Sequence, residues 1–300
     1  MSTIRELKNR INSVRNTQKI TNAMYLISST KLQNAKESLN RTRPFFQMQE
    51  NEIKRIFQTE GDVNSRYFYP ETGRKPAETY AYLVITADKG LAGSYNYNVI
   101  RQANAEMEKH MRVKLYVVGE YGRRYYQKHN IPIEQSFLYT AQNPTMHRAR
   151  EISHILLTEF NEKRVDEIRV IYSDMENELN STVKRMKLLP FERKPFLTPE
   201  EEKTHRDIHY KFHPSVTEVL DQFMPGYIAG FIYGALVDSF SAEQNARMKA
   251  MNSANQNAQE ILSNLQLEYN SVRQAVITQE ITEVSAGAKA QKRAKKGGGR

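Results

Sequence analysis

The sequence predicts an α/β fold: a central Rossmann-like domain with a parallel sheet, joined to a long antiparallel coiled coil of the N- and C-terminal helices. Apolar residues recur at steps of three and four along both ends of the chain, and the middle alternates β-branched runs with helical patterns. We expect an N-terminal coiled-coil helix at 1–57, an α/β domain at 77–210, a C-terminal coiled-coil helix at 214–286 and a basic, disordered tail at 287–300.

Residues 1–57 are typical of one long helix. Thr3 and Glu6 fit a capping box, in which hydroxyl and carboxylate satisfy the first free amides. Pro44 is expected to kink the helix, which at 1.5 Å per residue spans roughly 80 Å and should protrude from a small domain. One face forms a heptad seam, which favours a supercoiled partner helix; its residues are Ile4, Leu7, Ile11, Val14, Gln18, Thr21, Tyr25, Ser28, Leu32, Ala35 and Leu39.

The middle of the chain carries four short runs of β-branched and aromatic residues. They are TYAYLVIT (79–86), RVKLYVVG (112–119), EIRVIYSD (167–174) and STVKRMKLLP (181–190). Helical patterns at 95–111, 120–129 and 145–164 lie between the first three runs. Strands that alternate with helices are typical of a parallel sheet covered by helices on its faces.

From Pro214 to Val284 the chain is again helical in pattern. Pro225 and Gly226 are expected to kink or restart this helix, and Gly287 is expected to end it. A second seam covers Met248, Met251, Asn255, Ala258, Leu262, Leu265, Tyr269, Val272, Val276 and Gln279. Two seams at opposite ends of one chain can pair as an antiparallel coiled coil, each covering the other.

Polar residues interrupt both seams. Gln18, Thr21, Ser28 and Asn255 occupy positions that a maximally stable coiled coil would fill with Leu or Ile. Polar seam residues lower stability and can determine the register of the pair. The two helices can also diverge here and leave these side chains in solvent, and heptad spacing alone does not separate the two arrangements.

The charge and the cysteine content exclude several classes of protein. The net charge of +10 is concentrated at the chain ends, with six Lys or Arg and no acid in 289–300, and such ends suit an acidic partner. The sequence has no cysteine, which excludes disulfides, thiolate catalysis and Cys-ligated zinc. No run of about 18 apolar residues predicts a membrane span, and no secretion signal begins the chain, so we expect a cytoplasmic location.

Three segments could carry chemistry, and each has a structural explanation. Gly90 and Gly93 lie where a phosphate loop would, yet no complete phosphate-binding motif occurs and a tight turn explains both glycines. The carboxylates of DMENEL (174–179) have no nucleophile beside them and suit a solvated loop. His205, His209 and His213 are spaced for a metal site on a helix, but the residues between them alternate as in a strand.

The segment VRQAVITQEITEVSAGA (272–288) closely resembles the C-terminal signature of the gamma-subunit family of bacterial F-type ATP synthases. The matching positions are Ile277, Thr278, Glu280, Glu283, Gly287 and Ala288. The segments IRELKNRINSVRNTQKITNAMYLISSTKL (4–32) and ITADKGLAGSYNYNVI (85–100) are similar to the same family. The resemblance covers nearly the full chain, and the basic residues beyond Ala288 depart from the family pattern.

The resemblance implies a non-catalytic rotor shaft without a cofactor. One copy would thread the hexamer of alpha and beta subunits, join the epsilon subunit and the membrane c-ring, and couple proton flow to ATP synthesis at the beta subunits. It would lie at the cytoplasmic face of the bacterial plasma membrane, as a peripheral protein.

The resemblance also implies roles for individual residues. Gln18, Lys19 and Met24 would face the beta lever, although Met24 suits coiled-coil packing equally well. Arg273 and Gln274 would hydrogen-bond a beta loop near the shaft tip. The contact with the ring and epsilon would involve Ile208, Tyr210 and Lys211.

Two alternatives follow from the residues themselves. The positive ends suit a basic coiled-coil scaffold or a nucleic-acid-binding protein, which would bind DNA or RNA in a salt-sensitive way. The tail KAQKRAKKGGGR has no aromatic residue for base stacking, so no specific nucleic acid is expected. A Rossmann-type enzyme would instead hold a nucleotide at Gly90 to Gly93.

Overall fold

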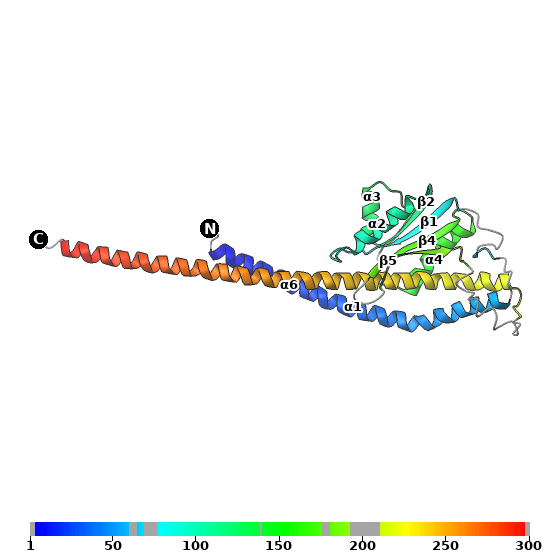
Figure 1. Cartoon of the computed structure of the whole chain (residues 1–300), viewed down its shortest axis with the longest axis horizontal. Helices are drawn as coiled ribbons and strands as arrows, with labels where there is room; N and C mark the ends of the chain where they lie inside the picture. The colour runs from blue at the N-terminus through cyan, green and yellow to red at the C-terminus, as the bar shows by residue number, and fades with distance from the viewer. Residues whose placement is uncertain are drawn as a thin grey trace. The chain divides into compact units, whose positions relative to one another are not determined.

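The computed structural model describes residues 4–59, 65–68, 77–138, 140–175, 181–192 and 211–297. The chain forms two compact units. The coil unit comprises Met1–Leu26 and Lys249–Arg300, and the sheet unit comprises Ile27–Met248. Two long helices, α1 (Ile4–Thr59) and α6 (Val216–Gly297), contribute to both units, and Figure 1 labels most of the elements named below.

The sheet unit contains a five-stranded sheet with the order β3-β2-β1-β4-β5. Its strands are β1 (Thr79–Ile85), β2 (Arg112–Val118), β3 (Gln135–Phe137), β4 (Glu167–Met175) and β5 (Ser181–Leu189). β1, β2 and β4 are parallel, as predicted, and β3, which was not predicted, pairs parallel with β2. The three-residue β3 is too short to leave a pattern in the sequence.

The sheet is mixed rather than wholly parallel, because β5 at one edge runs antiparallel to β4. Only five residues separate the two strands, and a parallel return needs a crossover of a dozen residues or more. Arg185 of β5 also pairs with the buried Glu106 of α2 (Tyr95–Met107) at 2.7 Å. Burial would raise the pKa of Glu106, but hydrogen bonds from Arg185 and Lys109 hold it below its usual value.

Helices cover both faces of the sheet. On one face α2 and α3 (Glu120–Lys128) pack against alternate residues of the central strands, such as Tyr82 and Val84. On the other face Leu83 and Ile85 join a core shared with α4 (Met146–Asn161), the C-terminal half of α1 and the N-terminal part of α6. Because helices cover both faces, Ala81 to Ile85 are all buried and β1 reads as a continuous apolar run.

Both long helices continue through positions where the sequence predicted an interruption. Pro44 and Pro225 lie inside unbroken helices, so α6 does not restart at Pro225-Gly226. A proline inside a helix costs about 3 kcal/mol or more. The neighbours Met224 and Ile228 are fully buried, and their packing holds the helix through the proline.

The C-terminal helix also passes the glycine that was expected to end it. α6 continues from Gly287 to Gly297, so the disordered tail predicted from residue 287 is wrong for residues up to 297. One glycine costs a helix about 1 kcal/mol. The residues that follow Gly287 are alanine, lysine and glutamine (288–291), and all three types are good helix formers. Thr3, the predicted cap of α1, lies outside the described residues.

A buried ion pair ties α6 to the loop that follows β1. The Arg247 guanidinium donates to the main-chain carbonyls of Lys89 at 3.3 Å and Gly90 at 3.0 Å. It also pairs with Glu243, one turn earlier on α6, at 2.6 Å. Burial raises the pKa of Glu243, and Arg247 opposes this rise. We call Arg247, Glu243 and these two carbonyls the α6 latch.

Gly119 connects β2 to α3 at a place where no other residue fits. Its φ of +94° is in the region that favours glycine, and a Cβ there would lie 2.3 Å from the Thr86 carbonyl oxygen. Its amide donates to the Phe137 carbonyl at 3.1 Å. The close approach therefore brings the end of β1 and the start of α3 together.

We predict that Gly119→Ala destabilises the sheet unit by at least about 2 kcal/mol, because both the backbone angle and the contact with Thr86 become unfavourable. Urea unfolding followed by circular dichroism measures the change. Gly90→Ala is the matched control: a Cβ at Gly90 meets nothing within 4 Å, so a change within about 0.5 kcal/mol is expected. Equal effects of the two substitutions would contradict this account of Gly119.

Candidate functional site

In the coil unit, α1 and α6 pack side by side along the predicted seams. Leu7 and Ile11 of α1 are buried, and so are Met251 and Ala258 of α6. Contacts between the helices pair Gln18 with Gln259 and Thr21 with Asn255, so the residue number falls on one helix as it rises on the other. The predicted antiparallel coiled coil is confirmed.

The polar residues of the seam bond to each other across the two helices. The Thr21 hydroxyl is hydrogen-bonded to the Asn255 side chain, and the Gln18 amide donates to the Gln259 carbonyl oxygen at 3.2 Å. Of the two arrangements that the heptad spacing left open, cross-helix pairing is the one observed at Gln18, Thr21 and Asn255. Ser28, in the sheet unit, is 1% exposed, so it is not in solvent either.

Beyond the paired region, α6 continues with no cover from any described residue of α1. Every residue from Arg273 to Gln291 is exposed. This segment, the overhang, carries an apolar stripe of Val276, Ile277, Ile281 and Val284, which are 36–73% exposed. In a protein, a helix gains most of its stability from packing its apolar face against another element, and a helix without such packing is marginal in water. Among the described residues, none covers the apolar stripe of the overhang.

The signature residues and the pair Arg273 and Gln274 all belong to the overhang. Ile277, Thr278, Glu280, Glu283, Gly287 and Ala288 are exposed. Their polar contacts are local: the Thr278 hydroxyl donates to the Gln274 carbonyl at 2.9 Å, and Gln279 donates to Glu283 at 2.9 Å. Arg273 and Gln274 are themselves exposed, so their side chains are accessible to another molecule.

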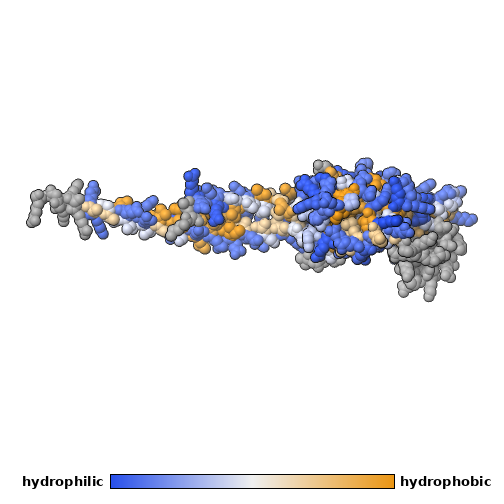
Figure 2. All heavy atoms as spheres, turned by 90° about the horizontal axis from the view of Figure 1, so that it is seen from above, coloured by the Kyte–Doolittle hydropathy of each residue, from blue (hydrophilic) through white to orange (hydrophobic). Residues whose placement is uncertain are grey.

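The outer surface of the coil unit combines positive charge with exposed apolar side chains. Arg5, Lys8, Arg10, Arg15 and Lys19 of α1 are all exposed. Ile20, Leu26, Ile261 and Leu267 are 47–68% exposed, and hydrophobic patches are visible among hydrophilic residues in Figure 2. Met24 is half-buried, so it takes part in packing and still presents surface.

Sequence reasoning missed the four exposed apolar residues Ile20, Leu26, Ile261 and Leu267. The available signal was their position, because each is an apolar residue that falls outside the seam. On a coiled coil whose only neighbour is its partner helix, such positions are normally polar. Where exposed apolar groups form a contiguous patch, they are typical of a surface that contacts other proteins.

The other sequence candidates do not form a chemical site among the described residues. Ile208, Tyr210, His205 and His209 lie outside these residues, and Lys211 and His213 are exposed. The part of the chain that the structure describes holds no group of three metal-binding side chains. At the start of DMENEL, Asp174 pairs with Lys184 of β5, which gives this carboxylate a structural role.

The loop after β1 does not present an anion-binding surface. Gly93 has φ +54°, as a tight turn requires, and the Ala87 amide is bonded to the Asn96 side chain at 2.9 Å. The carbonyls of Lys89 and Gly90 accept from Arg247 in the α6 latch. The loop therefore binds a helix of its own chain, and its geometry does not support the alternative of a nucleotide-dependent enzyme.

Within the described residues, no helix combines the length and the apolar character needed to cross a membrane.

Comparisons with known proteins agree with this geometry. The family model described as ATP synthase matches residues 3–291. The ATP synthase gamma chain of Caldanaerobacter subterraneus subsp. tengcongensis is 42% identical over 292 residues, which cover 95% of this chain and 98% of that protein.

Two solved structures share the fold. A chain of the central stalk and c-ring of the Tetrahymena thermophila mitochondrial ATP synthase matches with a TM-score of 0.61 and 24% identity, over 78% of this chain and 99% of that one. A chain from the OSCP, F1 and c-ring structure of the Euglena gracilis mitochondrial ATP synthase matches with a TM-score of 0.67 and 15% identity, over 98% and 96% of the two chains. The family model over residues 3–291 and the 42% identical relative show that the chain belongs to the ATP synthase gamma chain family.

Proposed function

We propose that this chain turns as the central shaft of an F-type ATP synthase and couples ion flow through a membrane c-ring to ATP synthesis on other subunits. The observation that carries the proposal is the overhang, since α6 leaves its partner at Val272 and continues for a further 25 residues with an exposed apolar stripe. A sleeve formed by a hexamer of alpha and beta subunits would cover that stripe. The chain itself would bind no nucleotide and catalyse no reaction.

An antiparallel pair of unlike helices suits such a role because it has no threefold symmetry. Three catalytic sites arranged around it meet three different surfaces at any moment. A shaft can shift the conformation of a surrounding site only where its contacts with the alternative states differ in free energy. The exposed basic residues of α1 and the exposed apolar residues Ile20 and Leu267 would make contacts of this unequal kind.

The polar layer of the seam supports the transmission of torque. Gln18, Thr21 and Asn255 bond only in one register of the two helices. A slip of one helix along the other would break these bonds and leave polar groups in the seam. The polar layer thus lowers the stability of the coiled coil and specifies the register of α1 against α6.

The individual contacts proposed here are those that the resemblance to the family implies. Gln18, Lys19 and Met24 would lie toward the beta lever, and Arg273 with Gln274 would hydrogen-bond a beta loop at the point where the seam ends. Ile208, Tyr210 and Lys211 would contact the epsilon subunit and the c-ring. The complex would hold one copy, as a peripheral subunit at the cytoplasmic face of the bacterial plasma membrane.

Co-purification with a tagged chain from its own cells tests the function. Recovery of two nucleotide-binding subunits in equal amounts, together with ATPase activity that the isolated chain lacks, is the expected result. Recovery of nucleic acid in their place, lost as salt is raised, would favour the basic scaffold and overturn the shaft.

We predict that Arg273→Ala weakens coupling in the assembled complex, because an exposed guanidinium at the start of the overhang would lose its hydrogen bonds to beta. ATP-driven ion pumping should fall by more than ATP hydrolysis does, measured on the same membrane vesicles. Arg150→Ala is the matched control, since Arg150 is an exposed arginine on α4. Pumping and hydrolysis that keep their ratio in Arg273→Ala would contradict the assigned contact.

We predict that Asn255→Leu stabilises the coil unit, because an apolar seam residue replaces a polar one. Thr21 keeps acceptors in its own helix, the carbonyls of Thr17 at 3.2 Å and Gln18 at 3.1 Å, so the substitution leaves no unpaired hydroxyl. Amide hydrogen exchange in the N-terminal turns of α1 should slow at least threefold. The same change on the exposed surface, Gln256→Leu, should leave the exchange unchanged, and faster exchange in Asn255→Leu would refute the role given to the polar layer.

A further inference from the structure

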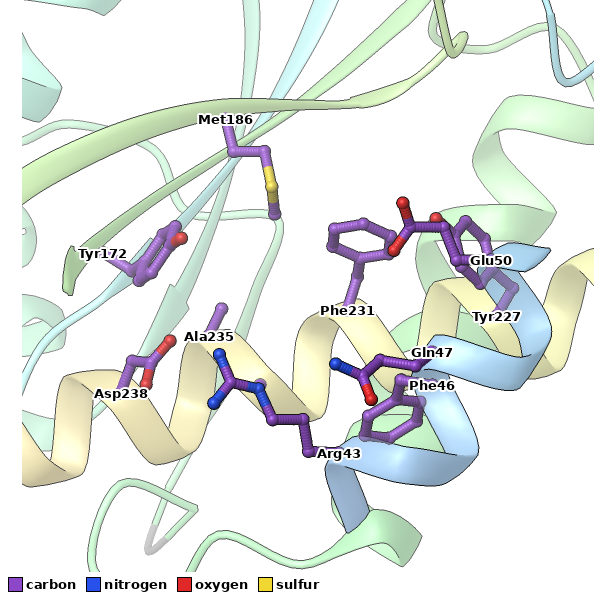
Figure 3. Close-up of a pocket in the computed structure, with 12 residues that line it drawn as sticks. Arg43, Phe46, Gln47, Glu50, Tyr172, Met186, Tyr227, Phe231, Ala235 and Asp238 are labelled. Atoms are coloured by element: carbon purple, nitrogen blue, oxygen red, sulfur yellow. The ribbon is translucent and has the colours of Figure 1, made fainter. Parts of the chain in front are cut away.

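A cavity of about 240 Å³ lies in the sheet unit where α1, α6, β4 and β5 meet (Figure 3). Its walls are mainly apolar and aromatic and include Phe46 of α1, Tyr172 of β4, Met186 of β5, and Tyr227 and Phe231 of α6. Neither the coil seam nor the overhang involves this cavity. It is therefore independent of the surfaces to which the shaft function is assigned.

Two glycines four residues apart on α6 line the cavity, and only one of them is explained by packing. A Cβ at Gly230 would lie 2.3 Å from the Phe46 ring, so glycine is needed there for the helices to approach. At Gly234 a Cβ would meet nothing within 4 Å, and its backbone is not in the left-handed region. Glycine lowers the stability of a helix relative to alanine. At Gly234 it therefore keeps space open at a cost in stability.

Asp238 stands one turn beyond Gly234, at one end of the cavity. Among the described residues its half-buried carboxylate has no hydrogen bond or ion pair. Burial and the neighbouring Asp174 raise the pKa of Asp238 to about 6, while Lys184 and Arg43 oppose the rise. Lys184 is paired with Asp174. Arg43 is an exposed residue of α1 that extends toward the same end of the cavity as Asp238 (Figure 3).

The remaining carboxylate of the lining has a partner. Glu50 lies at the other end of the cavity, close to Tyr227 in Figure 3, and pairs with Lys54 at 3.4 Å. The cavity therefore offers one carboxylate that lacks a direct partner, beside a set of apolar and aromatic walls. A carboxylate out of bulk water is stabilised most by a cation that forms a direct hydrogen bond with it.

We propose that this cavity binds a small organic ammonium compound, whose ammonium group pairs with Asp238 and whose apolar body occupies the space beside Gly234. The aromatic rings of Phe46, Tyr172 and Phe231 in the lining suit such a ligand in two ways, because aromatic rings pack against an apolar body and attract a cation. Arg43 does not block the pairing, since an exposed side chain can turn into solvent. An anionic ligand would meet the carboxylate of Asp238 and bind poorly.

Calorimetric titration of the full chain at pH 8 tests the site with two probes of similar size and opposite charge. The 2-phenylethylammonium ion should bind at least tenfold more tightly than 3-phenylpropionate. Its affinity should fall as the pH is lowered from 8 to 5, because protonation removes the charge of Asp238 while the amine stays charged. The isolated chain suffices, so the result does not depend on the shaft function.

Three variants separate this site from an unspecific apolar void. Asp238→Asn keeps the shape of the cavity and should weaken binding of the cation at least tenfold, while Gly234→Leu should abolish it by filling the space. Glu260→Gln removes an exposed carboxylate from the coil unit and should change nothing. Circular dichroism verifies that each variant is folded, and Asp238→Asn alone decides the matter if Gly234→Leu does not fold. Unchanged affinity in Asp238→Asn, equal binding of the two probes, or no binding of either would overturn the proposal.

Discussion

The packing of α1 against α6 is the contact on which the rest of the structure depends. In the coil unit it buries Leu7, Ile11, Met251 and Ala258 and joins the polar residues of the seam. In the sheet unit it brings Ser38 within 2.7 Å of Tyr233 and the Phe46 ring against Gly230. Neither helix has enough apolar surface to be stable alone, so each supplies the cover that the other lacks.

The two helices differ in length, and the functional surface follows from this difference. α1 has 56 residues and α6 has 82. Because α6 extends beyond the end of α1, the side chains of the overhang are exposed on every side of a single helix. A surface of this kind can contact a surrounding sleeve, whereas a fully paired coil would present mainly its outer charged faces.

The sheet unit holds α6 by buried polar contacts as well as by apolar packing. In the α6 latch, Arg247 lies between the Glu243 carboxylate and two carbonyls of the loop after β1. Removing one member of a buried pair usually leaves an uncompensated charge, which makes the latch specific for one position of the helix. Beside Gly234, by contrast, the same helix is not closely packed, because a cavity separates it from its neighbours.

The sequence by itself determined the two seams, the central parallel strands and the signature of the overhang, because these depend on local periodicity and residue type. The tertiary structure decided the rest. The direction of β5 depends on the length of its connection, and the helix through Pro225 depends on the burial of Met224 and Ile228. Three further features depend on residues far apart in the chain. They are the cross-helix pairing of Gln18, Thr21 and Asn255, the hydrogen bonds of Arg247 to the loop after β1, and the open space beside Gly234. Periodicity describes one helix at a time and carries no information on which side chain of another element stands opposite.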